Sequence, residues 1–168
     1  MRFVPLNLGQ HLDNAVEWFN DPEVTRWTLI GDLPLSQLKE KAFFEKVAES
    51  DGSDLVFAVE TLTGDHIGFA GLHNIDYRHG VATTGSVIGR KDLWGCGYGT
   101  EIVKIRTDYC FEVLGLRLLL AEVIDGNDAS LRMLKKVGYA EVGRVPKRYW
   151  KRGAFRDVIL LALTREKT

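Results

Sequence analysis

The sequence predicts one α/β domain, in the broad sense that includes α+β folds, with a mixed and mostly antiparallel central sheet flanked by helices. Three observations support this class. Short apolar runs separated by turn residues follow one another in the first half of the chain. A glycine-rich turn then leads into an amphipathic helix. The continuously apolar run 116–124 behind that helix predicts a buried central strand.

Composition limits the class of protein. The chain has 168 residues, of which 45% are hydrophobic, and a net charge of −1. We therefore expect a single domain over 1–168, with neither a nucleic acid nor a membrane as partner. The two cysteines, Cys96 and Cys110, form neither a disulfide framework nor a recognisable metal site, so no metal is expected. The lack of a long apolar run or signal-peptide core favours a cytoplasmic location.

The N-terminal part is expected to contain a short strand over 2–6 and two amphipathic helices. In the first helix, Leu12, Val16 and Phe19 share one face. The second helix is predicted over 34–49. Its apolar stripe is expected to comprise Leu35, Leu38, Ala42, Phe43 and Val47.

Four strands in antiparallel succession are predicted before the glycine turn. The three that follow the early helices cover 55–61, 67–72 and 81–89. The helix after the turn is predicted over 98–113. Its buried face is expected to hold Ile102, Ile105, Tyr109 and Val113. Behind the central strand, Asn127 is placed to cap a helix that Gly138 ends, and 139–150 and 155–163 predict a closing strand pair.

The turn at Gly95, Gly97 and Gly99 predicts a phosphate-binding site. Glycine allows close approach of the backbone to a ligand, and the free N–H groups of the following helix favour an anion. The spacing does not fit a dinucleotide fingerprint, and no lysine precedes Thr100 as a Walker P-loop requires. A tight turn without a ligand is the remaining alternative.

The stretch 94–101, Trp-Gly-Cys-Gly-Tyr-Gly-Thr-Glu, resembles the acyl-CoA pyrophosphate loop of the GNAT superfamily of N-acetyltransferases. That family's pattern, Gln/Arg-x-x-Gly-x-Gly/Ala, maps onto Trp94, Gly97 and Gly99. Tryptophan departs from the commonest first residue. Trp-Gly-x-Gly-Tyr is frequent in the branch that resembles the ribosomal-protein N-terminal acetyltransferases, so the resemblance points to that branch.

A second segment, 127–139, resembles the family's Asn-x-Ala-Ser…Gly-Phe/Tyr element. Together the two motifs imply the GNAT fold with splayed central strands, and acetyl-CoA as co-substrate. The backbone of Ser86 and its neighbours would pair with the pantetheine arm, and the loop amides would hold the pyrophosphate. The cofactor-binding residues that the resemblance implies are Val87, Ile88, Gly89, Trp94, Gly95, Cys96, Gly97, Tyr98, Gly99, Thr100, Asn127 and Ser130.

Transfer to an amine requires removal of a proton, because an alkylamine has a pKa of about 10.4 and is charged at neutral pH. The sequence carries Leu134 where many family members have a tyrosine acid, and Thr83 and Thr84 where many have a glutamate. The remaining catalytic candidates are His73, Ser86 and Tyr139, each of which also has a purely structural interpretation.

The resemblance implies an N-acetyltransferase that moves the acetyl group of acetyl-CoA directly to a primary amine in a ternary complex. The acceptor is either a protein N-terminal α-amine or a small amine such as a polyamine or an aminoglycoside. Asp21, Glu23 and Asp32 are candidates to attract a cationic amine. The alternative is a non-catalytic acyl-CoA-binding regulatory module. Family analogy also suggests a homodimer formed through the last strands.

Overall fold

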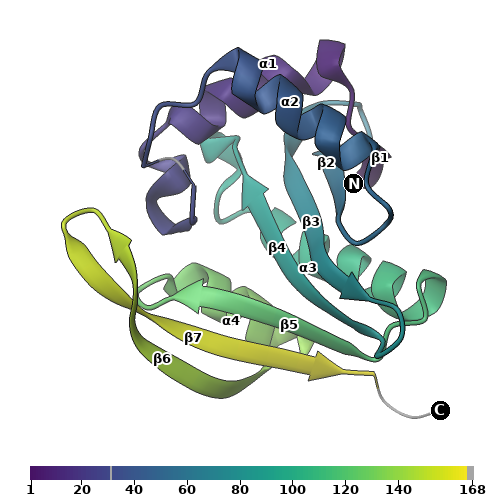
Figure 1. Cartoon of the computed structure of the whole chain (residues 1–168), viewed down its shortest axis with the longest axis vertical. Coiled ribbons are helices and arrows are strands. Elements are labelled where there is room, and N and C mark those ends of the chain that lie inside the picture. The colour runs from purple at the N-terminus through teal and green to yellow at the C-terminus, as the bar shows by residue number, and fades with distance from the viewer. Residues whose placement is uncertain (31, 166–168) are drawn as a thin grey trace.

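A computed structural model of the chain describes residues 1–30 and 32–165 (Figure 1). The strands are β1 (Arg2–Pro5), β2 (Leu55–Glu60), β3 (His66–Asp76), β4 (Val81–Ile88), β5 (Leu118–Ile124), β6 (Ala140–Lys151) and β7 (Ala154–Thr164). The α-helices are α1 (Leu8–Asn20), α2 (Gln37–Ala48), α3 (Tyr98–Asp108) and α4 (Asp128–Val137). Short 3-10 helices cover Val24–Trp27 and Lys91–Leu93, and a π-helical segment, Tyr109–Val113, continues α3.

The described residues form one seven-stranded sheet in the order β1-β2-β3-β4-β5-β7-β6. All neighbouring strands are antiparallel except β4 and β5, which run parallel. That parallel pairing covers only Val81–Leu118, Ala82–Leu119 and Thr83–Leu120, after which the two strands diverge (Figure 1). The predicted mixed, mostly antiparallel sheet with splayed central strands is confirmed.

Helices cover both faces of the sheet. On one face, α1 and α2 pack on β1–β4 through a cluster that includes Leu12, Phe44 and Phe69. On the other face, Ile102 of α3 packs against Ala70 of β3. Side chains alternate along β4, with Val87 in the α1–α2 cluster and Ile88 in the α3 cluster. Odd-numbered residues of β4 therefore face α1 and α2, and even-numbered residues face α3.

The predicted apolar stripe of α2 is wrong. The helix begins after Ser36, whose side chain caps the amide of Lys39, and it buries Glu40 and Phe44. Leu38 is 79% exposed and Phe43 is 40% exposed. In this orientation the Phe44 ring packs edge-on against Phe69 of the sheet, with a centroid distance of 6.2 Å.

The predicted buried face of α3 is correct at Ile102 and partly at Tyr109, which packs against the core, and it is wrong at Val113. Val103, Arg106 and Thr107 are buried, whereas Val113 is 67% exposed. The helix widens into its π-helical segment, where the amide of Leu114 donates to the carbonyl of Tyr109. Five-residue spacing changes the face that each later residue presents, so a count based on 3.6 residues per turn fails here.

Candidate functional site

The glycine loop that precedes α3 presents free amides to an open space. Gly95 and Gly97 have φ values of 79° and 92°, and a Cβ on either would meet no heavy atom within 4 Å. Gly97 is the N-cap of α3, and no side chain caps this helix end. The N–H groups of Tyr98, Gly99 and Thr100 therefore lack an intrahelical partner. These features fit an anionic group such as a pyrophosphate.

Two contacts fix the loop in place. The indole Nε1 of Trp94 donates to the carbonyl of Ile88 at 2.9 Å, which ties the loop to the end of β4. A Cβ on Gly99 would lie 2.6 Å from the sulfur of Met133, so glycine lets α3 and α4 approach closely. Trp94 occupies the first position of the acyl-CoA loop pattern, and its side chain thus anchors the loop to a backbone carbonyl of β4.

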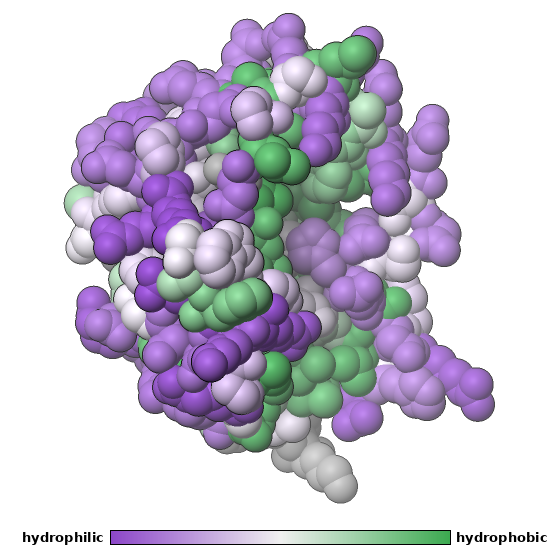
Figure 2. Space-filling model, turned by 60° about the vertical axis from the view of Figure 1, so that its left-hand side comes forward, coloured by the Kyte–Doolittle hydropathy of each residue, from purple (hydrophilic) through white to green (hydrophobic). Residues whose placement is uncertain are grey.

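The edge of β4 that faces β5 is open beyond Thr83. The amide of Gly89 bonds the carbonyl of Ile67, so by antiparallel alternation the pairs Val87–Phe69 and Gly85–Gly71 exchange bonds with β3. The backbone groups of Ser86 and Ile88 then point into the gap between β4 and β5. The carbonyl of Ile88 is taken by Trp94, which leaves the Ser86 groups and the Ile88 amide for a ligand. Figure 2, which turns the open side of the splay toward the viewer, shows a hollow lined with apolar side chains and flanked by hydrophilic ones.

The structure places His73 and Ser86 on opposite faces of the sheet. Ser86 shares the α3 face with Ile88, whereas His73 lies on the α1–α2 face, where its Nδ1 is 2.9 Å from Asp54 Oδ1. A Cβ on Gly71 would lie 2.5 Å from His73 Nε2, and one on Gly85 would meet nothing within 4 Å. Gly71 and Gly85 are paired across β3 and β4. Because neither has a side chain, they leave a notch in this face of the sheet beside the gap, and the His73 imidazole lies over its Gly71 side.

Tyr139 lies at the point where β4 and β5 separate. It is 3% exposed, and its hydroxyl is 3.3 Å from Thr84 Oγ1, which in turn donates to the carbonyl of Leu120 at 3.1 Å. Leu134 is buried in the same core. Tyr139 therefore belongs to a buried polar cluster on the α3 face that joins the two diverging strands.

A buried arginine in this cluster was missed in the sequence. Arg106 is 2% exposed and donates from Nη1 to the carbonyl of Gly85 at 2.6 Å. Burial lowers the pKa of its guanidinium, and the neighbouring Tyr139 raises it. Arg106 follows Ile102 by four residues and so shares its helix face. That spacing is the signal in the sequence, although the adjacent apolar Ile105 fits the same stripe.

Asn127 and Ser130 form the N-terminal cap of α4. The side chain of Asn127 accepts a hydrogen bond from the amide of Ser130 at 3.3 Å. The preceding Gly126 leaves room for Trp27, whose ring would lie 2.9 Å from a Cβ at that position. Capping accounts for the local geometry, and the contact of Asn127 with a CoA arm stays a prediction.

The acidic residues proposed to attract an amine are already paired with cations of the chain. Lys91 contacts both Asp21, at 2.8 Å, and Glu23. The hydrogen bond from Lys91 lowers the pKa of Asp21. Asp32 pairs with Lys151 at 2.9 Å. Each carboxylate is thus paired, with Asp21 and Glu23 sharing the single charge of Lys91, and the contacts tie the early helices to the loop after β4 and to the β6–β7 hairpin.

A cavity of about 420 Å³ on the α1–α2 face carries further acidic groups. It lies between the C-terminal end of α2, the loop that follows and β3, and its lining includes Glu49, Asp51, Asp54 and His73, together with Lys46. Carboxylates outnumber the lysine in this set. The cavity is thus a second candidate for the approach of a cationic amine, with the His73 imidazole on its wall.

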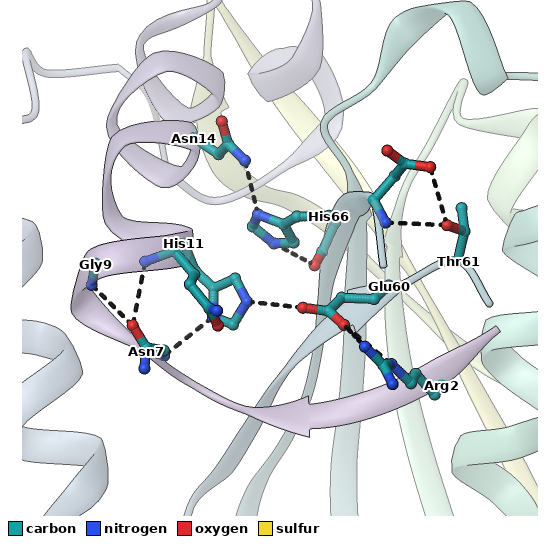
Figure 3. Close-up of polar contacts among 11 residues, drawn as sticks. Arg2, Asn7, Gly9, His11, Asn14, Glu60, Thr61 and His66 are labelled. Atoms are coloured by element: carbon teal, nitrogen blue, oxygen red, sulfur yellow. Dashed lines mark hydrogen bonds and ion pairs between the residues drawn. The ribbon is translucent and has the colours of Figure 1, made fainter. Parts of the chain in front are cut away.

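A polar network holds α1 on the edge of the sheet (Figure 3). His11 Nδ1 accepts from the amide of Asn7, so its Nε2 carries the proton and donates to Glu60, which also binds Arg2. His66 accepts from Asn14 at Nδ1 and donates from Nε2 to a backbone carbonyl. Burial, followed by the electrostatic influence of the nearby His11, lowers the pKa of His66 to about 4. The His66 imidazole is therefore neutral at pH 7, and both histidines have structural contacts.

The described residues contain neither a metal-binding cluster nor a membrane-spanning helix. Within 1–30 and 32–165 there is no cluster of three or more His, Cys, Asp or Glu side chains that could hold a metal ion. No helix in that part of the chain is long and apolar enough to cross a membrane.

Comparison with known proteins places this geometry in context. The family model described as an acetyltransferase (GNAT) domain matches residues 1–140. An uncharacterized N-acetyltransferase, p20, of Bacillus licheniformis is 27% identical over 157 residues, which cover 92% of this chain and 88% of that protein. Spermidine N(1)-acetyltransferase of Escherichia coli K12 is 27% identical over 162 residues, covering 94% of this chain and 80% of the relative.

Among solved structures, the spermidine N-acetyltransferase of Vibrio cholerae in complex with CoA and spermine superposes with a TM-score of 0.89. The two chains are 21% identical, and the superposition covers 97% of this chain and 94% of the other.

Proposed function

This chain belongs to the GNAT acetyltransferase family, and we propose that it acetylates a primary amine of a small polyamine-like cation. The family and its relatives establish the broader activity, an acetyl-CoA-dependent N-acetyltransferase. The finer assignment is supported by the curated relative named for spermidine, which aligns over 94% of this chain. That alignment is the observation that carries the proposal.

The donor side of the site fits acetyl-CoA. The free amides at the start of α3 and the side-chain-free surface of Gly95 and Gly97 suit the pyrophosphate. The open edge of β4 offers the Ser86 backbone and the Ile88 amide to an extended arm. When bound, acetyl-CoA supplies an acyl group activated by a thiol leaving group with a pKa of about 8.5. The chain's task is to orient that group in the gap.

The acceptor side supports His73 as the general base. Its Nδ1 faces Asp54, and that contact leaves Nε2 free to accept a proton from an amine, directly or through water. Nε2 lies over Gly71, on the β3 side of the glycine notch, and the His73 ring also lines the acidic cavity. Ser86 and Tyr139 lie on the α3 face, and we propose that they shape the donor side.

A thiol-release assay with acetyl-CoA tests the acceptor class. The panel comprises spermidine, an aminoglycoside, free amino acids, and peptides that begin with Ser or Ala, with a calorimetric acetyl-CoA titration run beside it. We expect turnover with spermidine. Turnover on the peptides alone would instead support the branch of protein N-terminal acetyltransferases.

The same assay separates the enzyme from a non-catalytic module. Tight acetyl-CoA binding without turnover on any amine would favour an acyl-CoA-binding regulatory role. The proposal also treats 1–168 as one catalytic domain, because its seven strands form one sheet. Dimerisation through the last strands stays a prediction.

A further inference from the structure

Arg106 is a buried cation without an anionic partner among the described residues. Its Nη1 donates to the carbonyl of Gly85, and its Nε has no partner. The other polar neighbours of the guanidinium are the Tyr139 hydroxyl and the Cys110 thiol, and neither is a carboxylate. Burying a guanidinium without a carboxylate is costly, and an apolar side chain of similar volume would serve the packing of α3 at least as well. The position therefore calls for a reason beyond stability.

The carbonyl that Arg106 contacts belongs to a particular peptide group. Gly85 C=O and Ser86 N–H are the two ends of one planar amide. That amide lies just beyond the last β4–β5 pair, Thr83–Leu120, where the Ser86 N–H points into the gap. A charged donor on the oxygen of an amide polarises it and strengthens hydrogen bonding at its N–H.

We propose that Arg106 is a positioning residue for acetyl transfer, acting through the Gly85–Ser86 peptide. By bonding the carbonyl of Gly85, the guanidinium makes the Ser86 amide a stronger donor to the thioester carbonyl oxygen. This inference rests on the proposed use of the gap for the acetyl group.

The chemistry explains why such a donor helps. In the transfer, the amine nitrogen bonds to the carbonyl carbon, the carbon–sulfur bond breaks with its electron pair on sulfur, and the amine proton passes to the base or to water. Negative charge develops on the carbonyl oxygen between these events. A fixed N–H directed at that oxygen lowers the barrier more than it strengthens ground-state binding.

The position of the Arg106 guanidinium also fits the presence of Leu134 where many family members carry a tyrosine. That side chain offers no proton donor at the position where many family members carry a tyrosine, and it is buried in the core. Arg106 approaches the same gap from α3, on the face opposite to His73. The donor side would then contribute a polarised backbone amide, and the acceptor side would contribute the base.

The test compares Arg106→Met with a matched control, Arg117→Met. Arg117 also donates to a backbone carbonyl, that of His79 at 2.8 Å, in the turn before β4 and away from the gap. For both variants we would measure acetyl-CoA affinity by calorimetry, kcat with the best amine, melting temperature, and the infrared carbonyl stretch of bound acetyl-CoA labelled with ¹³C at the carbonyl.

For Arg106→Met we expect kcat to fall roughly tenfold or more, with acetyl-CoA affinity within about twofold of the parent and no loss of melting temperature. The bound carbonyl stretch should move toward its value in solution. Arg117→Met should leave kcat and the bound carbonyl stretch unchanged. A parental kcat and carbonyl frequency in Arg106→Met would overturn the proposal, as would a drop in melting temperature with kcat per folded enzyme unchanged.

A second variant covers the case in which Arg106→Met does not fold. Arg106→Gln keeps a neutral donor in the buried site, so we expect the carbonyl stretch to shift in the same direction and kcat to fall. Parental values for both in Arg106→Gln would overturn the role of the charge. The infrared measurement needs no acceptor. Failure of the parent to bind acetyl-CoA would refute the donor site itself, and binding without an amine substrate would refute only the acceptor assignment.

Discussion

The two edges of β4 differ along most of their length. On one edge β4 pairs with β3 from Ile88 back to Val81, whereas on the other it pairs with β5 at only three positions. The paired edge anchors β4 in the sheet on which α1 and α2 pack. The unpaired edge exposes the Ser86 amide, with the glycine loop at its end and Arg106 behind it. One strand thus serves as scaffold on one side and as binding surface on the other.

The two edges of β4 differ because side chains join β4 to β5 at one place only. Thr84 Oγ1 donates to the carbonyl of Leu120 and contacts Tyr139, which completes the join at the last paired position. Beyond it, Gly85 and Ser86 bring little or no bulk, and the strands separate. Small side chains at the point of divergence leave room for an extended ligand in place of a neighbouring strand.

The largest expected effect is on the open edge. Gly97→Glu forces a side chain into a backbone conformation with φ of 92° and places a carboxylate among the free amides of α3. We expect acetyl-CoA affinity to weaken by roughly 100-fold or more, which corresponds to about 2.7 kcal/mol, as measured by calorimetry.

Gly115→Glu is the matched control for this change. Gly115 also has a positive φ, of 66°, and open space around it, but it lies beyond the π-helical segment, at the other end of the helix from the glycine loop. The strain is similar and the anion site is untouched, so affinity should stay near that of the parent. Equal affinity in the two variants would remove the glycine loop from the donor site.

A smaller effect is expected on the acceptor face beside the same edge. His73→Ala should lower kcat about 100-fold, because the imidazole is the proposed base above the Gly71–Gly85 notch. The pH dependence is the sharper measurement. In the parent, kcat/KM should fall as acid protonates His73, and this acidic limb should vanish in the variant. A profile of the parental shape would leave His73 with a structural role toward Asp54.

The smallest effect concerns the paired edge. His66, at the start of β3, has its pKa lowered to about 4, compared with 6.5 for a free imidazole. Above pH 6.5 it is neutral in both states. Between 6.5 and 4 the unfolded chain binds a proton that the native state refuses, so the free energy of unfolding should fall as pH decreases, by about 1–3 kcal/mol in all.

Urea unfolding of the parent and of His66→Gln at pH 7, 5.5 and 4.5 would measure this. The variant should be less stable at pH 7, because it loses the contacts to Asn14 and the Gly68 carbonyl, and its dependence on pH should be shallower. Identical slopes in the two proteins would show that another group governs acid stability.

The sequence was sufficient for the fold and for the glycine loop because both depend on local patterns. Alternating glycines before an amphipathic run predict a turn with free amides, and the apolar run 116–124 predicts a central strand. The face of α2 and the burial beyond the end of α3 were predicted wrongly, because α2 turns Phe44 toward Phe69 of the sheet and the helical spacing changes to π after Asp108.

The parts of the site that could not be predicted depend on contacts between distant segments. Lys91 pairs with Asp21 and, across 68 positions, with Glu23, so no local pattern could indicate that the early carboxylates are paired. The opposite placement of His73 and Ser86 follows from strand register, which short apolar patterns do not define. The burial of Arg106 could not be predicted either, because arginine side chains mostly face solvent and no local pattern marks this one as buried.

The unpaired edge of β4 also has a consequence for solvent exchange. Amides within the ladders of β3 and β7 release their protons only when the sheet opens, whereas the amides of Ser86 and Ile88 have no strand beside them to protect them. In the free protein they should exchange with deuterium quickly although they lie in the middle of a seven-stranded sheet. A ligand that completes the edge would slow them, so occupancy of the cleft could be followed at single backbone positions without any turnover.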